Sequence, residues 1–232
     1  MKDNYNLGTT ISFLSNLEQN NNREWFAEHK GEYQQAWDEM INFADALLSE
    51  MQQHDQIVTP TGKKSLFRIY RDVRFSKNKL PYKNNLGGGF RRATKFLRGG
   101  YYFQIQPGNC FVAGGFWGPN SQDLLHIRKQ IAMDPDPLRE VLADKDFKKN
   151  FGTLEGEQLK TAPKGFDKED PAIDLLRYKQ FVIYKSFSDK ETKSKDFHKK
   201  MAEGFVAMRP FFDYMTDILT TDLNGEERRD LY

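Results

Sequence analysis

The chain has 232 residues, of which 38% are hydrophobic and 14% aromatic, enough to bury one sizeable core. Its mean hydropathy is −0.77, and neither an apolar leader segment nor an unbroken apolar run of about 18 residues occurs, so we expect neither export nor membrane insertion. Cys110, the single cysteine, cannot form an internal disulfide, which favours a reducing cytoplasm. No linker or repeat marks a boundary, so we expect one domain over residues 1–232.

Charge is concentrated in residues 62–98. This segment contains one acid, Asp72, and twelve basic residues: Lys63, Lys64, Arg68, Arg71, Arg74, Lys77, Lys79, Lys83, Arg91, Arg92, Lys95 and Arg98. The segment therefore carries +11, and since the whole chain carries only +2, the remainder carries −9. Such polarisation is typical of a surface that meets an anionic partner.

Helical periodicity dominates the amino-terminal part. A short helix is expected over residues 11–17, followed by a long helix over residues 23–53. Asn21 and Glu24 form an N-x-x-E capping pattern at the start of the long helix.

The period changes to two at residue 66, which predicts a strand over residues 66–75. One face of this strand would be apolar and face the core, through Phe67, Ile69, Val73 and Phe75. The other would place Arg68, Tyr70 and Arg74 on one side, about 7 Å apart, with Asp72 between them. The glycines 87–89 that follow suggest a mobile loop, one able to close over a ligand.

Two further strands are expected at residues 101–106 and 110–116, joined by a hairpin at residues 107–109. After them, Asn120 or Ser121 caps a helix, Asp136 with Pro137 opens another, and Asp170 with Pro171 repeats this pattern. A fourth strand is expected over residues 180–187 and a last long helix over residues 194–220, kinked at Pro210. The expected class is α+β: an antiparallel sheet of about four or more strands packed against several helices, with long amino- and carboxy-terminal helices.

The basic strand and the loop after it contain the residue types that bind phosphate. Arginine binds two oxygens at once, lysine supplies a point charge, and hydroxyl groups add neutral donors. We expect an anion site made of Arg68, Tyr70, Arg71, Arg74, Ser76, Lys77, Lys79, Tyr82 and Lys83. The alternative is a solvated basic strand whose arginines pair with acids elsewhere in the fold.

Four long motifs give the chain a resemblance to a known family: NNREWFAEHKGEY, RIYRDVRFSKNKLPYK, GGFWGP and LKTAPKGFDKEDPAIDLLRYK. In this order they resemble the DUF2461 family, a conserved family of unknown function, over residues 13–219. The family usually writes S-K-D-K-T-P-Y-K where this chain has Asn78 and Leu80, and a histidine is common where it has Asp170. The resemblance implies a shared site at residues 68–83 but no activity.

Two functions are therefore open. One is binding of an anionic, phosphate-bearing ligand, a nucleic acid or other polyphosphate. The other is a metal-independent enzyme acting on a small phosphorylated substrate, with Asp72, Lys79 and Tyr82 as candidate catalytic residues. Neither a cofactor motif nor metal-ligand spacing is present, and a hard-metal pair at Asp170 and Asp174 is explained more simply by capping. The sequence does not indicate the ligand or the oligomeric state.

Overall fold

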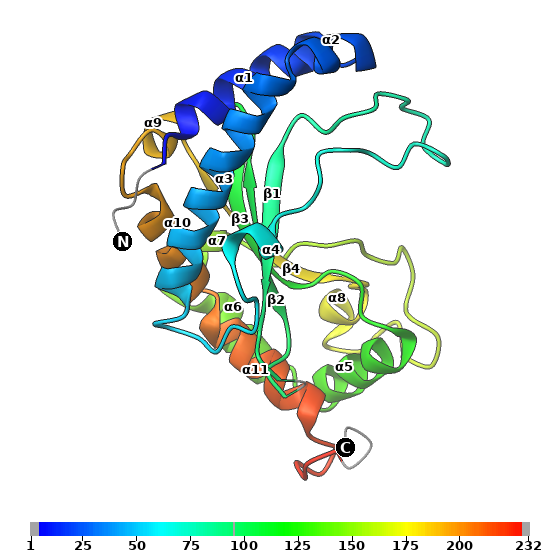
Figure 1. Ribbon diagram of the computed structural model, residues 1–232. Helices are drawn as coiled ribbons and strands as arrows, with labels where there is room; N and C mark the ends of the chain where they lie inside the picture. The colour runs from blue at the N-terminus through cyan, green and yellow to red at the C-terminus, as the bar shows by residue number, and fades with distance from the viewer. Residues whose placement is uncertain (1–4, 95, 229–232) are drawn as a thin grey trace. The chain divides into compact units, whose positions relative to one another are not determined.

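A computed structural model describes residues 5–94 and 96–228, which contain eleven helices and four strands (Figure 1). The helices are α1 (Leu7–Gln19), α2 (Arg23–Glu28), α3 (Lys30–Met51), α4 (Gly62–Ser65), α5 (Ser121–Met133), α6 (Asp136–Ala143), α7 (Lys145–Phe151), α8 (Ile173–Leu176), α9 (Asp189–Thr192), α10 (Phe197–Val206) and α11 (Arg209–Thr220). The strands are β1 (Leu86–Arg91), β2 (Gly100–Ile105), β3 (Cys110–Phe116) and β4 (Phe181–Phe187). The strands form one antiparallel sheet in the order β1-β2-β3-β4, so the α+β class is confirmed.

Contacts between Cα atoms divide the chain into two compact units. Unit 1 takes the described residues of Met1–Arg91, Tyr102–Val112 and Ser186–Glu203, and unit 2 takes those of Arg92–Tyr101, Ala113–Lys185 and Gly204–Tyr232. The expectation of a single domain stays a prediction.

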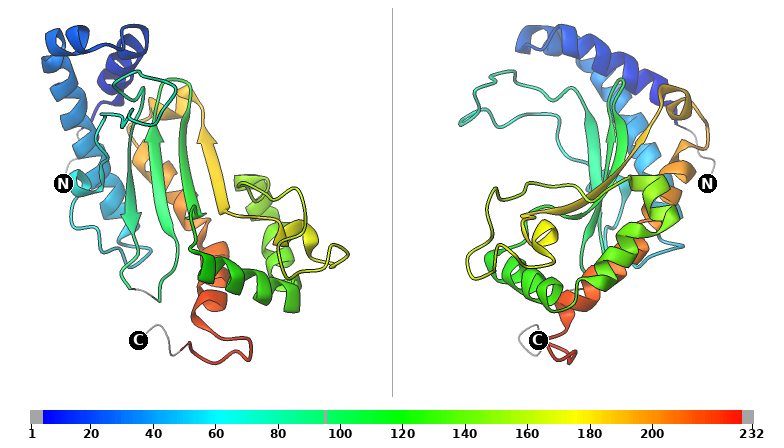
Figure 2. Two further views of the ribbon diagram at one scale, coloured as in Figure 1. Left: turned by 90° about the vertical axis from the view of Figure 1, so that its right-hand side faces the viewer. Right: turned by 180° about the vertical axis from the view of Figure 1, so that it is seen from behind.

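Unit 1 is organised around α3, which packs on α1, α4 and β1 (Figure 2). Phe43 of α3 makes an edge contact with Phe103 of β2, their ring centroids 6.1 Å apart, and stacks on Phe197 of α10 at 6.0 Å. Each of these three rings is fully buried. Alternation along β2 therefore leaves Tyr102 on the opposite face, where its ring is only half-buried.

Unit 2 is organised around α11, which packs on α5 and α6. Phe211 and Phe212 of α11 are fully buried, and Phe212 lies 5.0 Å from the ring of Tyr101. Arg98 forms an ion pair with Asp123 at 2.5 Å, which fixes the start of α5. Arg92 is 5% exposed and donates to the backbone carbonyl of Arg98.

The sequence predicted β2, β3, β4, the intervening hairpin and α1 correctly, but the segment 66–75 is not a strand. It makes only two isolated bridges, Leu66 to Gly88 and Tyr70 to Tyr82. Phe75 is 95% and Phe67 50% exposed, so they do not face the core. Of the four residues expected to face the core, Ile69 is buried, but among the described residues the segment has no neighbouring strand with which to form a ladder, and Pro81 on the return limb has no N–H to donate.

The first strand is instead β1, which contains the glycines read as a mobile loop. A Cβ on Gly87 would lie 2.5 Å from the carbonyl oxygen of Phe103, and one on Gly88 2.7 Å from that of Ser65. Glycine is therefore needed at these positions for close approach of neighbouring backbones, not for mobility.

The two long helices are each interrupted. The first ends at Glu28 and resumes at Lys30, and its cap is Asn22, whose side chain accepts from Trp25 N, rather than Asn21. At the carboxy terminus, Pro210 lies in the first turn of α11 and marks a new helix rather than a kink.

Candidate functional site

The predicted site lies on a long connection between α4 and β1, residues 66–85, which we call the arm (Figure 1). Its two limbs run antiparallel and are joined by sparse backbone hydrogen bonds. Arg71 N donates to Pro81 O at 2.9 Å, and Lys83 N donates to Ile69 O at 2.8 Å. The arm is therefore an irregular two-limbed ribbon, and the strand face expected to align Arg68, Tyr70 and Arg74 does not exist.

Two buried side chains root the arm in unit 1. Ile69 is fully buried, and Tyr82, 6% exposed, stacks on Phe26 of α2 with ring centroids 4.0 Å apart and planes 13° apart. Burial raises the pKa of the Tyr82 hydroxyl. Tyr70 lies 5.5 Å from the Tyr82 ring but remains 51% exposed. The base of the arm is thus packed, and the part beyond it is not.

Asn21 attaches the arm to the turn between α1 and α2. Its side-chain amide donates to Tyr82 O at 3.1 Å, and its side-chain oxygen accepts from Tyr82 N at 3.2 Å. These two hydrogen bonds resemble those between neighbouring strands and hold the return limb at Tyr82. The sequence reading missed this role because three consecutive asparagines all resemble helix caps, and only one of them can cap.

The cations of the arm differ in whether they bind other groups of the protein. Arg74 is held by Asp72, with Nε to Oδ1 at 3.0 Å and Nη2 to Oδ2 at 2.7 Å. Lys79 Nζ donates to Val73 O at 2.9 Å. By contrast, within the described parts of the chain neither Arg68 nor Arg71 forms an ion pair.

Lys83 is the half-buried cation of the return limb. Its Nζ lies 5.9 Å from the centroid of the Phe67 ring. Burial, and secondarily the charge of Arg68, lowers the pKa of the Lys83 ammonium.

Two hollows lie between the arm and the turn joining α1 to α2. The larger, about 490 Å³, is lined by Asn21, Asn22, Arg23, Glu24, Val73, Asn78, Lys79, Leu80 and Pro81. The smaller, about 220 Å³, is lined by Glu18, Asn21, Arg71, Asn78, Leu80, Tyr82, Lys83, Asn84 and Asn85. The smaller hollow brings together Arg71, Tyr82 and Lys83 of the predicted set. Its acid, Glu18, accepts a hydrogen bond from Asn84 at 2.8 Å.

Asp72 lines neither hollow. Its side chain is 48% exposed, and the hydrogen bonds from Arg74 lower its pKa. A carboxylate in this setting is an anchor for one arginine. The remaining predicted residues, Ser76 and Lys77, are on the distal part of the arm, Ser76 half-buried and Lys77 exposed.

The basic segment 62–98 does not form one surface. Arg92 and Arg98 serve the interior of unit 2, Lys63 and Lys64 are exposed on α4, and Lys95 lies outside the described residues. Six of the twelve cations, Arg68, Arg71, Arg74, Lys77, Lys79 and Lys83, are on the arm.

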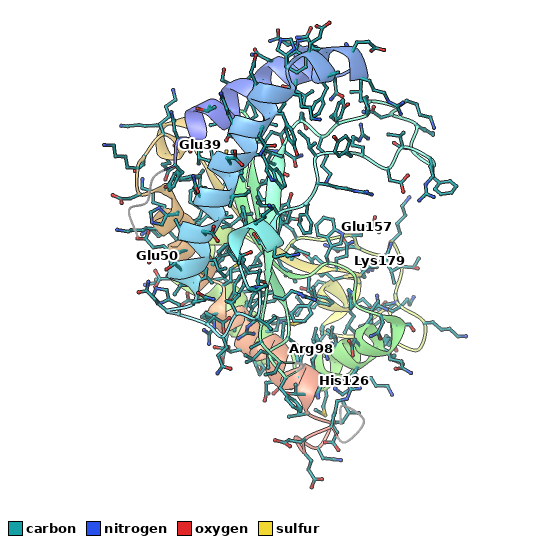
Figure 3. The ribbon with its side chains drawn as sticks, in the orientation of Figure 1. Glu39, Glu50, Arg98, His126, Glu157 and Lys179 are labelled. Carbon is teal, nitrogen blue, oxygen red and sulfur yellow. The ribbon has the colours of Figure 1, made fainter. Side chains whose placement is uncertain are left out.

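Charged residues outside the arm have structural partners within unit 2. Lys179 forms an ion pair with Glu157 (Figure 3). Asp174 binds Arg139 at 2.8 Å, and Asp170 accepts from Ala172 N at 2.8 Å. The described residues hold no cluster of three or more His, Cys, Asp or Glu side chains able to bind a metal ion. No helix within them has the length and apolar character needed to cross a bilayer.

The structure thus defines an α+β protein with a cationic, aromatic-bearing arm beside two hollows. A family model described as "Conserved hypothetical protein (DUF2461)" matches residues 9–214. The chain belongs to this family, and the resemblance of its motifs is confirmed. Neither a curated protein nor a solved structure matches the chain.

Proposed function

We propose that the arm binds a phosphate-bearing polyanion, a nucleic acid or another polyphosphate. The observation that supports this most is the different use of the three arginines. Asp72 occupies Arg74, whereas Arg68 and Arg71 form no ion pair within the described residues. Guanidinium groups held on a ribbon with unsatisfied charge fit an external anion.

The position of the lysines supports an extended ligand. Lys83 lies on the return limb opposite Ile69, beside Arg71 in the smaller hollow, and Lys79 lines the larger one. Successive phosphates of one chain would therefore find cations from the base of the arm to its distal part. We place this binding in the cytoplasm, on the basis of the single cysteine.

The enzyme alternative, acting on a small phosphorylated substrate through Asp72, Lys79 and Tyr82, stays a prediction. An acid–base role would be favoured by an enclosed carboxyl group whose pKa is raised. The exposed, arginine-bound carboxylate of Asp72 supports the binding proposal instead.

The test compares two double variants that each remove two positive charges from the basic segment. In R68A/R71A we expect a marked loss of affinity for oligo-dT and for long-chain inorganic polyphosphate, measured by isothermal titration calorimetry. In K63A/K64A, which lies on α4 outside the arm, we expect affinity close to wild type. Both variants should keep the wild-type melting temperature, because the four side chains have no acid partner in the described fold.

Salt dependence provides a second readout. The logarithm of affinity for oligo-dT should fall linearly with the logarithm of salt concentration, by about 0.7 per phosphate contact. R68A/R71A should reduce that slope by about 1.4, since two contacts are lost. Unchanged affinity and slope in R68A/R71A would contradict the proposal, and so would a large loss of stability.

A further inference from the structure

Three aromatic rings on the arm are exposed to solvent. Phe75 is 95%, Tyr70 51% and Phe67 50% exposed. Exposed rings of this size have no role in the hydrophobic core, so an arm that served only charge would have little use for them.

Two of the three exposed rings have a cation beside them. The guanidinium carbon of Arg74 lies 5.9 Å from the centroid of Phe75, and Lys83 Nζ lies 5.9 Å from that of Phe67. Tyr70 instead lies beside Tyr82, with ring centroids 5.5 Å apart. An aromatic ring and a cation therefore lie together at two places on the arm, at Phe67 and at Phe75.

Phe67 also begins a series of three neighbouring rings that continues onto the sheet. Its ring lies 6.2 Å from that of Tyr102 with planes 22° apart, and Tyr102 lies 5.7 Å from Phe111 of β3. Tyr102 and Phe111 are half-buried on the face of the sheet opposite Phe103, which packs on α3. Phe67, which is 50% exposed, is thus the outermost ring of this aromatic series.

We infer that the polyanion is a single-stranded nucleic acid whose bases stack on Phe67, Tyr70 and Phe75 while Arg68, Arg71 and Lys83 bind its phosphates. This inference rests on the proposed function and names its ligand. Each nucleotide of a single strand offers one base face and one phosphate, which matches the recurrence of ring and cation. Inorganic polyphosphate has no ring, and a duplex has its base faces covered.

An anionic membrane is the other ligand considered, because it combines negative charge with an apolar interior. It fits the arm less well, because a membrane would meet the exposed tip around Phe75. Phe67 lies at the base of the arm, where its N–H donates to Gly87 O of β1 at 2.9 Å. Its near-parallel stacking on Tyr102 suits a base rather than a lipid chain.

The experiment uses the full chain and replaces single rings by leucine, which keeps apolar volume but has no π face. Binding of fluorescein-labelled oligo-dT is followed by fluorescence anisotropy, with long-chain polyphosphate measured in parallel. In Phe75→Leu and Phe67→Leu we expect oligo-dT affinity to fall by at least about five-fold, the lower end of stacking on one base. Polyphosphate affinity should stay unchanged in both variants. A blunt-ended duplex with the same number of nucleotides per strand should bind less tightly than the single strand.

Failure of the inference and failure of the proposed function give different results. If both leucine variants bind oligo-dT like wild type while R68A/R71A loses both probes, stacking is wrong and polyanion binding stands. If wild type binds neither probe, both are wrong. If wild type binds vesicles of anionic phospholipid but not oligo-dT, the arm is a membrane contact and the inference is overturned. Circular dichroism of each variant should match wild type, since Phe75 and Phe67 lie outside the core.

Discussion

Asp72 holds one of the three arginines of the arm in an ion pair. Its carboxylate holds Arg74 through Nε and Nη2, and the same hydrogen bonds lower its pKa. Asp72→Asn keeps the shape, removes the negative charge and frees Arg74, so we expect polyanion affinity equal to or higher than wild type. Titration calorimetry with oligo-dT measures this, and a marked loss would mean that Asp72 instead braces the arm.

The lowered pKa of Asp72 also predicts a pH dependence. The carboxylate stays charged above its lowered folded-state pKa and becomes neutral as pH falls through that value. Any difference in affinity between wild type and Asp72→Asn should therefore persist through neutral pH and shrink only in acid, below the usual range of an aspartate. A difference that disappears near or above that range would contradict the pairing with Arg74.

The Asn21 side chain forms two hydrogen bonds with the backbone of the return limb. Asn21→Ala removes both hydrogen bonds to Tyr82, each worth about 0.5–1.5 kcal/mol. We expect hydrogen–deuterium exchange at the Tyr82 amide to accelerate strongly. Asn78→Ala, which removes only a local bond to Leu80 N, is the matched control and should leave Tyr82 protected. Equal exchange in both variants would show that Asn21 does not hold the arm.

Strand β1 depends on close approach of backbones, and this can be tested at one glycine. A Cβ at Gly88 would lie 2.7 Å from Ser65 O and 2.8 Å from the Phe103 ring. Gly88→Ala should therefore lower the free energy of unfolding by about 1–3 kcal/mol through overpacking. Gly31→Ala in α3, where nothing lies within 4 Å, should raise it by about 0.5–1 kcal/mol. Urea denaturation distinguishes the two signs, and a neutral Gly88→Ala would mean that β1 has room for a side chain at this position.

The main difference between prediction and structure is the position of the first strand. Residues 66–75 alternate like a strand and residues 86–91 are rich in glycine, yet the second forms the strand. Strand formation depends on a neighbour at the right distance, which β2 provides for β1. The glycines of β1 allow neighbouring backbones to approach closely, but a run of glycines is equally typical of a flexible loop.

At the scale of the whole molecule, the arm is an appendage with separate folding requirements. Within residues 67–85, the only buried apolar or aromatic residues are Ile69 and Tyr82. Both lie between the base of the arm and the Arg71–Pro81 hydrogen bond. Replacing residues 72–80 by Gly-Gly should leave the melting temperature within a few degrees of wild type, on the order expected for loop changes. Polyanion affinity should fall, because Arg74, Lys77, Lys79 and Phe75 are removed. A cooperative loss of fold on scanning calorimetry would show that the distal arm stabilises the core.

The sequence alone determined the α+β class, three of the four strands, the hairpin at Gly108 and the location of the excess positive charge. These features follow from local alternation, turn residues and composition, which neighbouring residues largely decide. Tertiary structure decided which cations serve the fold and which face solvent. Arg92 and Arg98 are bound within unit 2, while Arg68 and Arg71 form no ion pair with any described residue, although all four are equally charged in the sequence. Their different roles depend on acids and carbonyls distant in the chain, such as Asp123, and long-range contacts of this kind leave no periodic signal.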